Sequence, residues 1–310
     1  MYNPLVSVII PNYCHAKYLD QRIQSVLGQT YQNFEVIILD DCSPDNSASQ
    51  LVIEKYRDDP HVSHIIYNEQ NSGSTFKQWN KGFDSAIGEY CWIAESDDFC
   101  DNDLLVKLVE QTKKYANVSI VACNSQFVDE KGKLLSPILK EDDTITFFKG
   151  IDFIRCKMMH GNGIYNASSA IFKREYALQI DPQYMNYVAA GDRLFWIELA
   201  EKGNVVFLSS PKNYFRQHQN KVSPQKQRNG TTSREDYKIV RYLEKKGYIF
   251  FSEHFIVRDK YLTDVKSSEF DSEYIKRSLV RLWTYNGFMP QRLMRCLLNI
   301  YFKFKSKVNI

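Results

Sequence analysis

Hydrophobic residues in the first part of the chain gather in short runs that alternate with amphipathic stretches. Four apolar runs have the length of buried strands: 5–10, 34–39, 62–67 and 90–94. Three stretches between them are predicted to be helical: 17–29, 47–56 and 75–87. Because strand alternates with helix along this part of the chain, the pattern predicts a doubly wound α/β sheet.

The pattern is less regular in the second half. Further strands and a hairpin are predicted at 118–123, 124–135, 168–172 and 205–208. Residues 219–235 are polar, contain Gly230 and lack apolar periodicity, which predicts a mobile loop or a linker. From Tyr237 the pattern predicts helix. We therefore expect an α/β domain with a mixed, mainly parallel sheet over 1–220, and the loop with a helical extension over 221–310.

Three carboxylates end the fourth predicted strand. Its apolar residues stop at Ala94, and Glu95, Asp97 and Asp98 follow. In open α/β sheets, ligands bind at the edge formed by the carboxyl ends of the strands. Crowded carboxylates repel one another, and a hard divalent cation offsets that repulsion. A solvated acidic loop is the alternative, but polar residues also follow the first and second strands, which favours a shared site.

Neither of the two familiar phosphate-binding motifs is present. The turn after the first strand, 11–15, is Pro-Asn-Tyr-Cys-His and lacks the GxGxxG of dinucleotide-binding enzymes. No Walker A sequence occurs anywhere in the chain. A nucleotide would therefore have to be held by carboxylates and a metal ion.

Composition bears on the cellular location. No run of about 18 apolar residues is present, and the N-terminus lacks the basic segment and cleavage site of a signal peptide. The seven cysteines are scattered and form no CxxC pair, which indicates free thiols in a reducing compartment. We therefore expect a cytoplasmic protein.

Ordered motifs occupy about the first 125 residues. They are 7–13 (SVIIPNY), 25–30 (SVLGQT), 40–45 (DDCSPD), 71–73 (NSG), 80–82 (NKG), 88–90 (GEY) and 95–98 (ESDD). This stretch resembles the N-terminal half of family 2 glycosyltransferases with the GT-A fold, a family that includes bacterial surface-polysaccharide enzymes. The resemblance implies that the first two strand ends bind a nucleotide base. It also implies that the acidic motif binds the ribose and a metal-bridged diphosphate.

Individual residues follow from the resemblance. Pro11 and Tyr13 would flank the base, and Asp41 would accept a hydrogen bond from it. Asp97 and Asp98 would share the ribose and a Mn²⁺ or Mg²⁺ ion, with the division between them left open.

Other positions match the family less directly. Lys77 or Gln78 lies where some relatives carry an arginine toward the nucleotide. Glu95 stands where the family usually has aspartate, so a direct role is not carried over to its longer side chain. The glycine-rich stretch 160–166 faces the acceptor in the resembled family, and an ordinary surface loop is the alternative.

Two residues beyond these motifs complete the predicted site. Asp192 follows a glycine and precedes an apolar helical stretch, so one interpretation is a helix N-cap. By resemblance to inverting members, Asp192 is also the candidate general base for the acceptor hydroxyl. His218 follows the last predicted core strand and would complete the metal site, since neutral imidazole binds manganese. A surface histidine is the alternative.

The C-terminal segment 274–310 is basic and aromatic, and no acidic residue follows Glu273. We interpret it either as an amphipathic helix on the anionic inner face of the plasma membrane or as a helix packed on the domain. Basic and aromatic residues also mix in nucleic-acid-binding proteins, but no nucleic-acid motif accompanies them here. We therefore expect no nucleic-acid partner.

Together with the resemblance, these features predict a metal-dependent, inverting glycosyltransferase. It would move a sugar from a nucleotide-sugar donor, by resemblance a UDP-sugar, to a hydroxyl of a glycan or lipid-linked acceptor in surface-polysaccharide synthesis. A nucleotidyltransferase is one alternative, but residues 11–17 lack the glycine- and basic-rich triphosphate loop that it would need. A catalytically silent nucleotide- or glycan-binding subunit is another, and the acidic pair with Asp192 argues against it.

Overall fold

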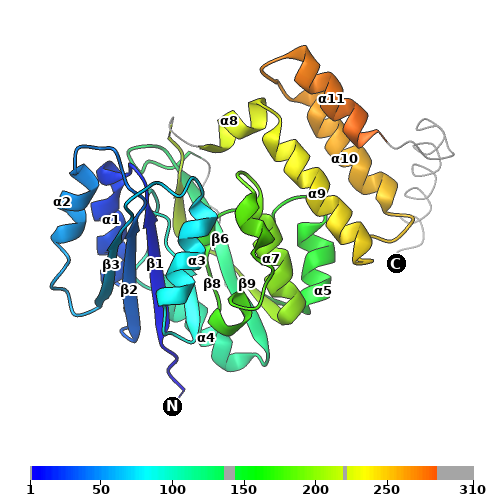
Figure 1. The fold of residues 1–310 in the computed structure, drawn as a ribbon. Coiled ribbons are helices and arrows are strands. Elements are labelled where there is room, and N and C mark those ends of the chain that lie inside the picture. Colours follow the sequence, from blue (N-terminus) through cyan, green and yellow to red (C-terminus); the bar gives the residue numbers. More distant parts are fainter. Residues whose placement is uncertain (1, 136–143, 219–221, 285–310) are drawn as a thin grey trace. The chain divides into compact units, whose positions relative to one another are not determined.

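Nine strands of the described residues form one mixed sheet in the first of two units, Met1–Val222 and Ser223–Ile310. The structure is a computed structural model and describes residues 2–135, 144–218 and 222–284 (Figure 1). The strands are β1 (Val6–Asn12), β2 (Phe34–Asp40), β3 (Val62–Tyr67), β4 (Tyr90–Ile93), β5 (Phe99–Cys100), β6 (Val118–Val128), β7 (Ile145–Phe148), β8 (Ala170–Lys173) and β9 (Asn204–Arg216). Their order is β3-β2-β1-β4-β8-β6-β9-β5, and β7 also pairs with β9.

The part of the sheet formed by β1 to β4 is parallel. Strand β1 pairs with β2 and β4, so that Ile9 lies opposite Ile37 and Ile93. Strand β8 is antiparallel to both β4 and β6, whereas β6 and β9 form a long parallel ladder. The predicted mixed, mainly parallel sheet is confirmed. The carboxyl ends of β1, β2 and β4 therefore meet at one edge, where ligands bind in such sheets.

Helices cover both faces of this sheet (Figure 1). They are α1 (Ala16–Leu27), α2 (Ala48–Glu54), α3 (Thr75–Ser85), α4 (Leu104–Lys114), α5 (Gly150–Phe153), α6 (Arg174–Ala177) and α7 (Gly191–Lys202), with short helices η1 (Ile154–Met158), η2 (Ala167–Ser169) and η3 (Pro182–Asn186). Because side chains alternate along a strand, Val6, Val8 and Ile10 share one face. There they form an apolar cluster with buried residues of α1, α2 and α4.

The opposite face is covered by α3 and α7. Gly82 of α3 approaches β1 so closely that a Cβ there would collide with the Ile9 side chain. Phe83 of α3 stacks on Phe195 of α7, with 5.7 Å between ring centroids, and both rings contact Phe172 of β8. This packing explains why the NKG motif needs its glycine, and it fixes α7 on the sheet.

Helix α7 also carries a buried carboxyl group. Burial raises the pKa of Glu198 to about 7, although the Asp181 N–H donates a hydrogen bond to it at 3.0 Å. The folded-state pKa lies above the unfolded value of about 4.3. The group therefore stabilises the fold most below that value, and this contribution is lost as the pH rises through about 7.

We expect Glu198→Gln to raise the free energy of unfolding by on the order of 2–3 kcal/mol at pH 8.5, and by only a fraction of that at pH 4.5. Glutamine keeps the size and an acceptor oxygen but cannot ionise, so the pH-dependent cost disappears. Denaturant unfolding of both proteins at the two pH values measures the difference. An effect of equal size at both values would contradict the assigned titration.

The described chain after residue 221 is largely helical. Its helices are α8 (Val222–Arg228), α9 (Thr231–Lys245), α10 (His254–Ser267) and α11 (Glu273–Trp283). The predicted loop or linker at 219–235 is therefore wrong for 222–228 and 231–235. The exposed residues Gln225, Gln227 and Arg228 favour helix without an apolar stripe. Gly230, with a left-handed φ of 77°, separates α8 from α9.

The described part of segment 274–310 packs within its own unit. Trp283 of α11 is buried and stacks on Tyr261 of α10, with 4.5 Å between ring centroids. Its indole N–H donates to Ser233 of α9 at 2.8 Å. Residues 285–310, which carry much of the membrane-surface hypothesis, lie outside the described residues. No described helix is long and apolar enough to cross a bilayer.

Candidate active site

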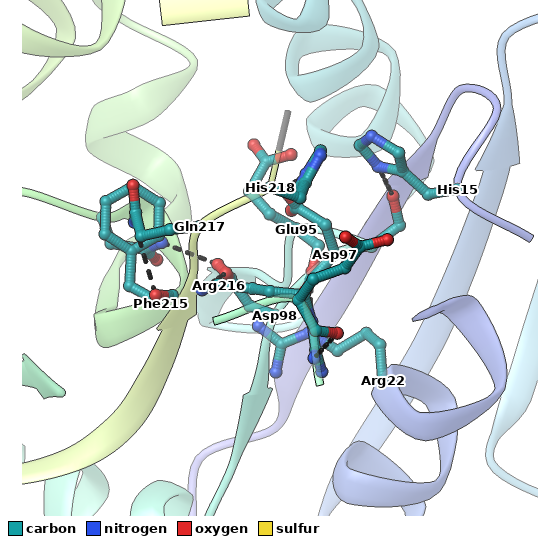
Figure 2. A network of polar contacts seen from close by, with 12 residues as sticks. His15, Arg22, Glu95, Asp97, Asp98, Phe215, Arg216, Gln217 and His218 are labelled. Carbon is teal, nitrogen blue, oxygen red and sulfur yellow. Dashed lines mark hydrogen bonds and ion pairs between the residues drawn. The ribbon is translucent and has the colours of Figure 1, made fainter. Parts of the chain in front are cut away.

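The acidic motif lies in the loop between β4 and β5 and is held by two buried arginines (Figure 2). Arg22 of α1 donates from Nε to the Glu95 carbonyl at 2.9 Å. Arg216, the last residue of β9, donates from Nε to the Asp97 carbonyl at 2.8 Å. Both arginines are at most 2% exposed. They fix the path of the loop and place two positive charges beside its carboxylates.

Asp98 is fully buried, and both of its carboxylate oxygens accept hydrogen bonds from protein donors. Oδ2 accepts from Asn166 Nδ2 at 2.6 Å and from Ser168 Oγ at 2.8 Å. Oδ1 accepts from the Arg216 N–H at 3.0 Å. Hydrogen bonds to an ionised acceptor are stronger than neutral ones. Asp98 therefore ties the acidic loop to β9 and to the segment that precedes β8.

Asp97, by contrast, lies beside two histidines (Figure 2). Its Oδ2 is 2.9 Å from His218 Nε2, and the two side chains are 13% and 3% exposed. One ligand atom each from His15, Asp97 and His218 lies within 4.8 Å of the others. Among the described residues, this is the group of histidine, cysteine and carboxylate side chains that could hold a metal ion. The structure thus brings together Asp97 and His218, and places Asp98 outside the group.

Glu95 links the acidic loop to α3. The Trp79 indole N–H donates to Glu95 Oε1 at 2.8 Å. Burial, and after it repulsion from the Asp97 carboxylate, raises the pKa of Glu95 to about 8. Near pH 7 the group is therefore mostly protonated, which lowers the negative charge beside Asp97.

The loops after β1 and β2 are hydrogen-bonded to each other. Asp40 accepts from Asn12 Nδ2 and from Ser43 Oγ, each at 2.7 Å. The Cys14 N–H donates to Ser43 Oγ at 2.9 Å. Cys14 and Cys42 have left-handed φ angles of 58° and 57°, which are uncommon for residues other than glycine. Both strand ends are thus held in a defined conformation at the edge predicted to bind a nucleotide.

The predicted base-binding residues lie along this edge and differ in exposure. Pro11 is buried in β1, whereas Tyr13 is 46% exposed. Asp41 is buried and accepts five hydrogen bonds, four from side chains and one from a main-chain N–H. The donors belong to Asn68, Asn71, Ser72 and Gln78. Lys77 is exposed on α3 and donates to the Ser72 carbonyl at 3.1 Å. In this conformation Asp41 organises the loop after β3.

Asp192 lies in the first turn of α7. The N-cap of this helix is Ala190, so the interpretation of Asp192 as the N-cap is wrong. Asn162 donates from Nδ2 to Asp192 Oδ2 at 2.7 Å, and the Arg193 N–H donates to Oδ1 at 2.8 Å. The buried Arg193 guanidinium donates to the Met158 carbonyl at 2.6 and 3.1 Å. The glycine-rich stretch and the start of α7 are therefore bound to each other.

One short segment joins Asp192 to the acidic loop. Asn162 binds Asp192, and Asn166 binds Asp98. The conformation of Asn166 is fixed in turn, because its Oδ1 accepts from the Ser168 N–H at 2.6 Å. The short segment 162–166 thus contacts both Asp192 of α7 and Asp98 of the acidic loop.

A comparison with protein families identifies the family of this chain. The model of glycosyl transferase family 2 matches residues 7–177, more than half of the chain. The chain belongs to this family.

Similar members come from several bacteria. This glycosyltransferase is 28% identical over 202 residues to the putative teichuronic acid biosynthesis glycosyltransferase TuaG of Bacillus subtilis, covering 65% of this chain and 74% of TuaG. It is 32% identical over 126 residues to glycosyltransferase GlyG of Streptococcus pneumoniae, covering 41% of this chain and 40% of GlyG. An uncharacterized glycosyltransferase of Rickettsia felis is 32% identical over 150 residues, or 48% of this chain and 24% of that protein. The chain thus aligns with less than half of the last two relatives.

Solved structures confirm the GT-A fold of this family 2 glycosyltransferase. TarS of S. aureus, in complex with UDP-GlcNAc, has a TM-score of 0.57 at 18% identity and covers 89% of this chain and 70% of that chain. The mannosyltransferase PcManGT of Pyrobaculum calidifontis, in complex with GDP-Man and Mn²⁺, has a TM-score of 0.53 at 15% identity. That match covers 91% of this chain and 85% of PcManGT.

Sequence reasoning gives no role to three residues at the site of this glycosyltransferase. His15 ends the turn 11–15. Its position, as a histidine close to a strand end, is the feature of the sequence that could have indicated a role at the site. Arg22 is a charged residue on the apolar side of α1, beside Ile23, and Arg216 follows the apolar run of β9. A charged residue within an apolar pattern indicates that its side chain is buried against a polar partner. The pattern does not indicate that this partner is the main chain of the acidic loop.

Proposed function

We propose that this glycosyltransferase is metal-dependent and inverts the configuration of the transferred sugar. The observation that carries the proposal is the short segment 162–166, in which Asn162 binds Asp192 and Asn166 binds Asp98, the neighbour of Asp97 in the acidic loop. Direct displacement at the anomeric carbon needs a base for the incoming hydroxyl and stabilisation of the leaving diphosphate. Asp192 and Asp97 would supply these two functions from one connected region.

Asp97 and His218 would hold the metal ion, and we propose Asp97 rather than Asp98 as its carboxylate ligand. The residues present fit Mn²⁺, which accepts carboxylate and imidazole ligands. A bound divalent ion would stabilise the charge on the departing diphosphate. Arg22 and Arg216 hold the main chain of the loop, so little reorganisation would be needed when the donor binds.

Asp192 would take the proton from the acceptor hydroxyl as that oxygen attacks the anomeric carbon. A general base must be held in position within hydrogen-bond distance of the proton that it removes. Asn162 and the Arg193 N–H each bind one oxygen of the carboxylate and so set its orientation. The buried Arg193 side chain fixes the loop that carries Asn162.

The nucleotide would bind at the ends of β1 and β2. Pro11 and Tyr13 would flank the base, and Asp41 would accept a base N–H by exchanging one of its present donors, such as Gln78. Lys77, which directly precedes Gln78 on α3, is exposed and would interact with the nucleotide-sugar donor as a cation.

Similar proteins suggest which donor and which acceptor this enzyme uses. TarS is described in complex with UDP-GlcNAc, and TuaG is named for teichuronic acid biosynthesis. We therefore propose a UDP-sugar donor and, as acceptor, a hydroxyl of a growing surface glycan or lipid-linked glycan.

The test is a donor screen with the purified full chain. Incubation with a panel of UDP-, GDP- and TDP-sugars and Mn²⁺, analysed by mass spectrometry, should show turnover of one UDP-sugar above the others. Matched reactions with a chelator should lose most of that turnover. Preference for a GDP- or TDP-sugar would overturn the donor assignment. Nucleotide binding without turnover of any donor, in the presence of candidate acceptors, would instead identify a silent binding subunit.

A further inference from the structure

We propose that His15 is a third protein ligand of the metal ion and makes the site prefer Mn²⁺ to Mg²⁺. This inference rests on the proposed metal-dependent function. It adds a residue from the loop after β1, a loop that the family resemblance connects with the nucleotide base and not with the metal. The ligand set would then be two imidazoles and one carboxylate, from His15, His218 and Asp97.

The spacing of the three side chains fits a common ion. Their ligand atoms all lie within 4.8 Å of one another. Metal–nitrogen distances of about 2.1 Å place two ligands on opposite sides of one ion about 4.2 Å apart. Small side-chain rotations would therefore be enough to close the site. The three residues follow β1, β4 and β9, so the fold itself brings them together at one edge of the sheet.

His15 is held in place by the acidic loop. Its Nδ1 lies 2.9 Å from Ser96 Oγ, and Ser96 directly precedes Asp97. When Nδ1–H donates to Ser96, the lone pair of the neutral ring is on Nε2, the atom that we propose as the ligand. Such a hydrogen bond from the second ring nitrogen orients most metal-binding histidines. Figure 2 shows His15 and His218 on the same side of Asp97.

The local backbone is consistent with a functional constraint on His15. It is the N-cap residue of α1, but its side chain makes no capping hydrogen bond. The preceding residue, Cys14, has a left-handed φ of 58°. Such a conformation costs on the order of 1 kcal/mol in a non-glycine residue and persists where the surroundings enforce it. The His15 ring also packs edge-on against the His218 ring, at 5.4 Å between centroids.

The donor set determines which ion is preferred. Mg²⁺ takes oxygen ligands and keeps several waters, so imidazoles add little to its affinity. Ions from Mn²⁺ onward in the first transition row accept imidazole, and their affinity for nitrogen sites rises along the series. A site with two histidines should therefore discriminate more strongly against Mg²⁺ than a site with one.

The test measures ion binding directly. Mn²⁺ and Mg²⁺ are titrated into the full chain, with UDP as the probe nucleotide, and pulsed electron paramagnetic resonance counts the nitrogens coupled to Mn²⁺. We expect two coupled nitrogens in the wild type and one in His15→Ala. We also expect at least about tenfold weaker Mn²⁺ binding in the variant, with a much smaller change for Mg²⁺. His64→Ala is the matched control, because His64 is an exposed histidine on β3.

A second variant separates ligation from a structural role. His15→Asn keeps a polar atom close to the Nδ1 position that faces Ser96 but has no equivalent of Nε2. If it loses the nitrogen signal and the Mn²⁺ preference as His15→Ala does, ligation is supported. Wild-type nitrogen counts and ion preference in both variants would overturn the proposal while leaving the metal-dependent transferase intact. A wild-type chain that binds no Mn²⁺ and is fully active in chelator would overturn the metal site itself.

Discussion

The Asp192→Asn variant should turn over the donor and acceptor about 10²–10⁴-fold more slowly than the wild type, which is the usual contribution of a general base. Asparagine keeps the shape of the side chain and one acceptor oxygen, but it cannot take the hydroxyl proton. Donor affinity should change little, because Asp192 faces the acceptor in the proposed mechanism. Steady-state kinetics with saturating donor, together with calorimetric binding of UDP, measures both quantities.

A stability measurement decides whether Asp192 acts through catalysis or through the fold. The N-cap of α7 is Ala190, so Asp192 supports the fold through its charge in the first turn and through its hydrogen bond from Asn162. The charge contributes typically about 0.3–1 kcal/mol, and asparagine keeps an oxygen that can accept from Asn162. The control is Asp152→Asn, which removes an exposed aspartate from the first turn of α5. A large loss of Tm with nearly unchanged turnover would show that Asp192 is structural.

The strands that form the core could be predicted because their apolar runs are short, continuous and bounded by polar residues. The prediction at 5–10 matches β1 (Val6–Asn12), and that at 34–39 matches β2 (Phe34–Asp40). Strand β9 could be predicted only in its first half, because the strand extends to Arg216 whereas the apolar run stops at 208. Its second half is polar enough to resemble a loop, and pairing with β6 keeps it extended. That extension carries Arg216 and His218 to the acidic loop.

The candidate site was predictable as a set of strand ends but not as a set of contacts. Parallel strands end at one edge, so Asp41, Asp97 and Asp98 could be placed near one another. Which aspartate turns inward depends on side-chain directions after the strand, where the alternation of faces no longer applies. Asp98 turns toward Asn166 and Ser168, two residues about 70 positions away in the sequence. No local pattern encodes such a contact.

Changing each of the two neighbouring aspartates to asparagine should therefore affect different properties of the protein, metal-dependent binding for Asp97 and stability for Asp98. Asp97→Asn should weaken Mn²⁺-dependent UDP binding by at least about 100-fold, because the site loses its carboxylate ligand. Its effect on the free energy of unfolding should be within about 1 kcal/mol, since Asp97 is partly exposed. Calorimetric titration of UDP with and without Mn²⁺ tests the first expectation, and thermal unfolding of the metal-free protein tests the second.

Asp98→Asn should instead destabilise the fold by about 3 kcal/mol or more. Its fully buried carboxylate accepts hydrogen bonds from Asn166, Ser168 and the Arg216 N–H, and an amide would turn an N–H group toward at least one of these donors. Asp58→Asn, at an exposed position, provides the matched control for both variants. If Asp98→Asn kept the wild-type Tm but lost Mn²⁺-dependent UDP binding, Asp98 would be the metal ligand, and the assignment of Asp97 would have to be reversed.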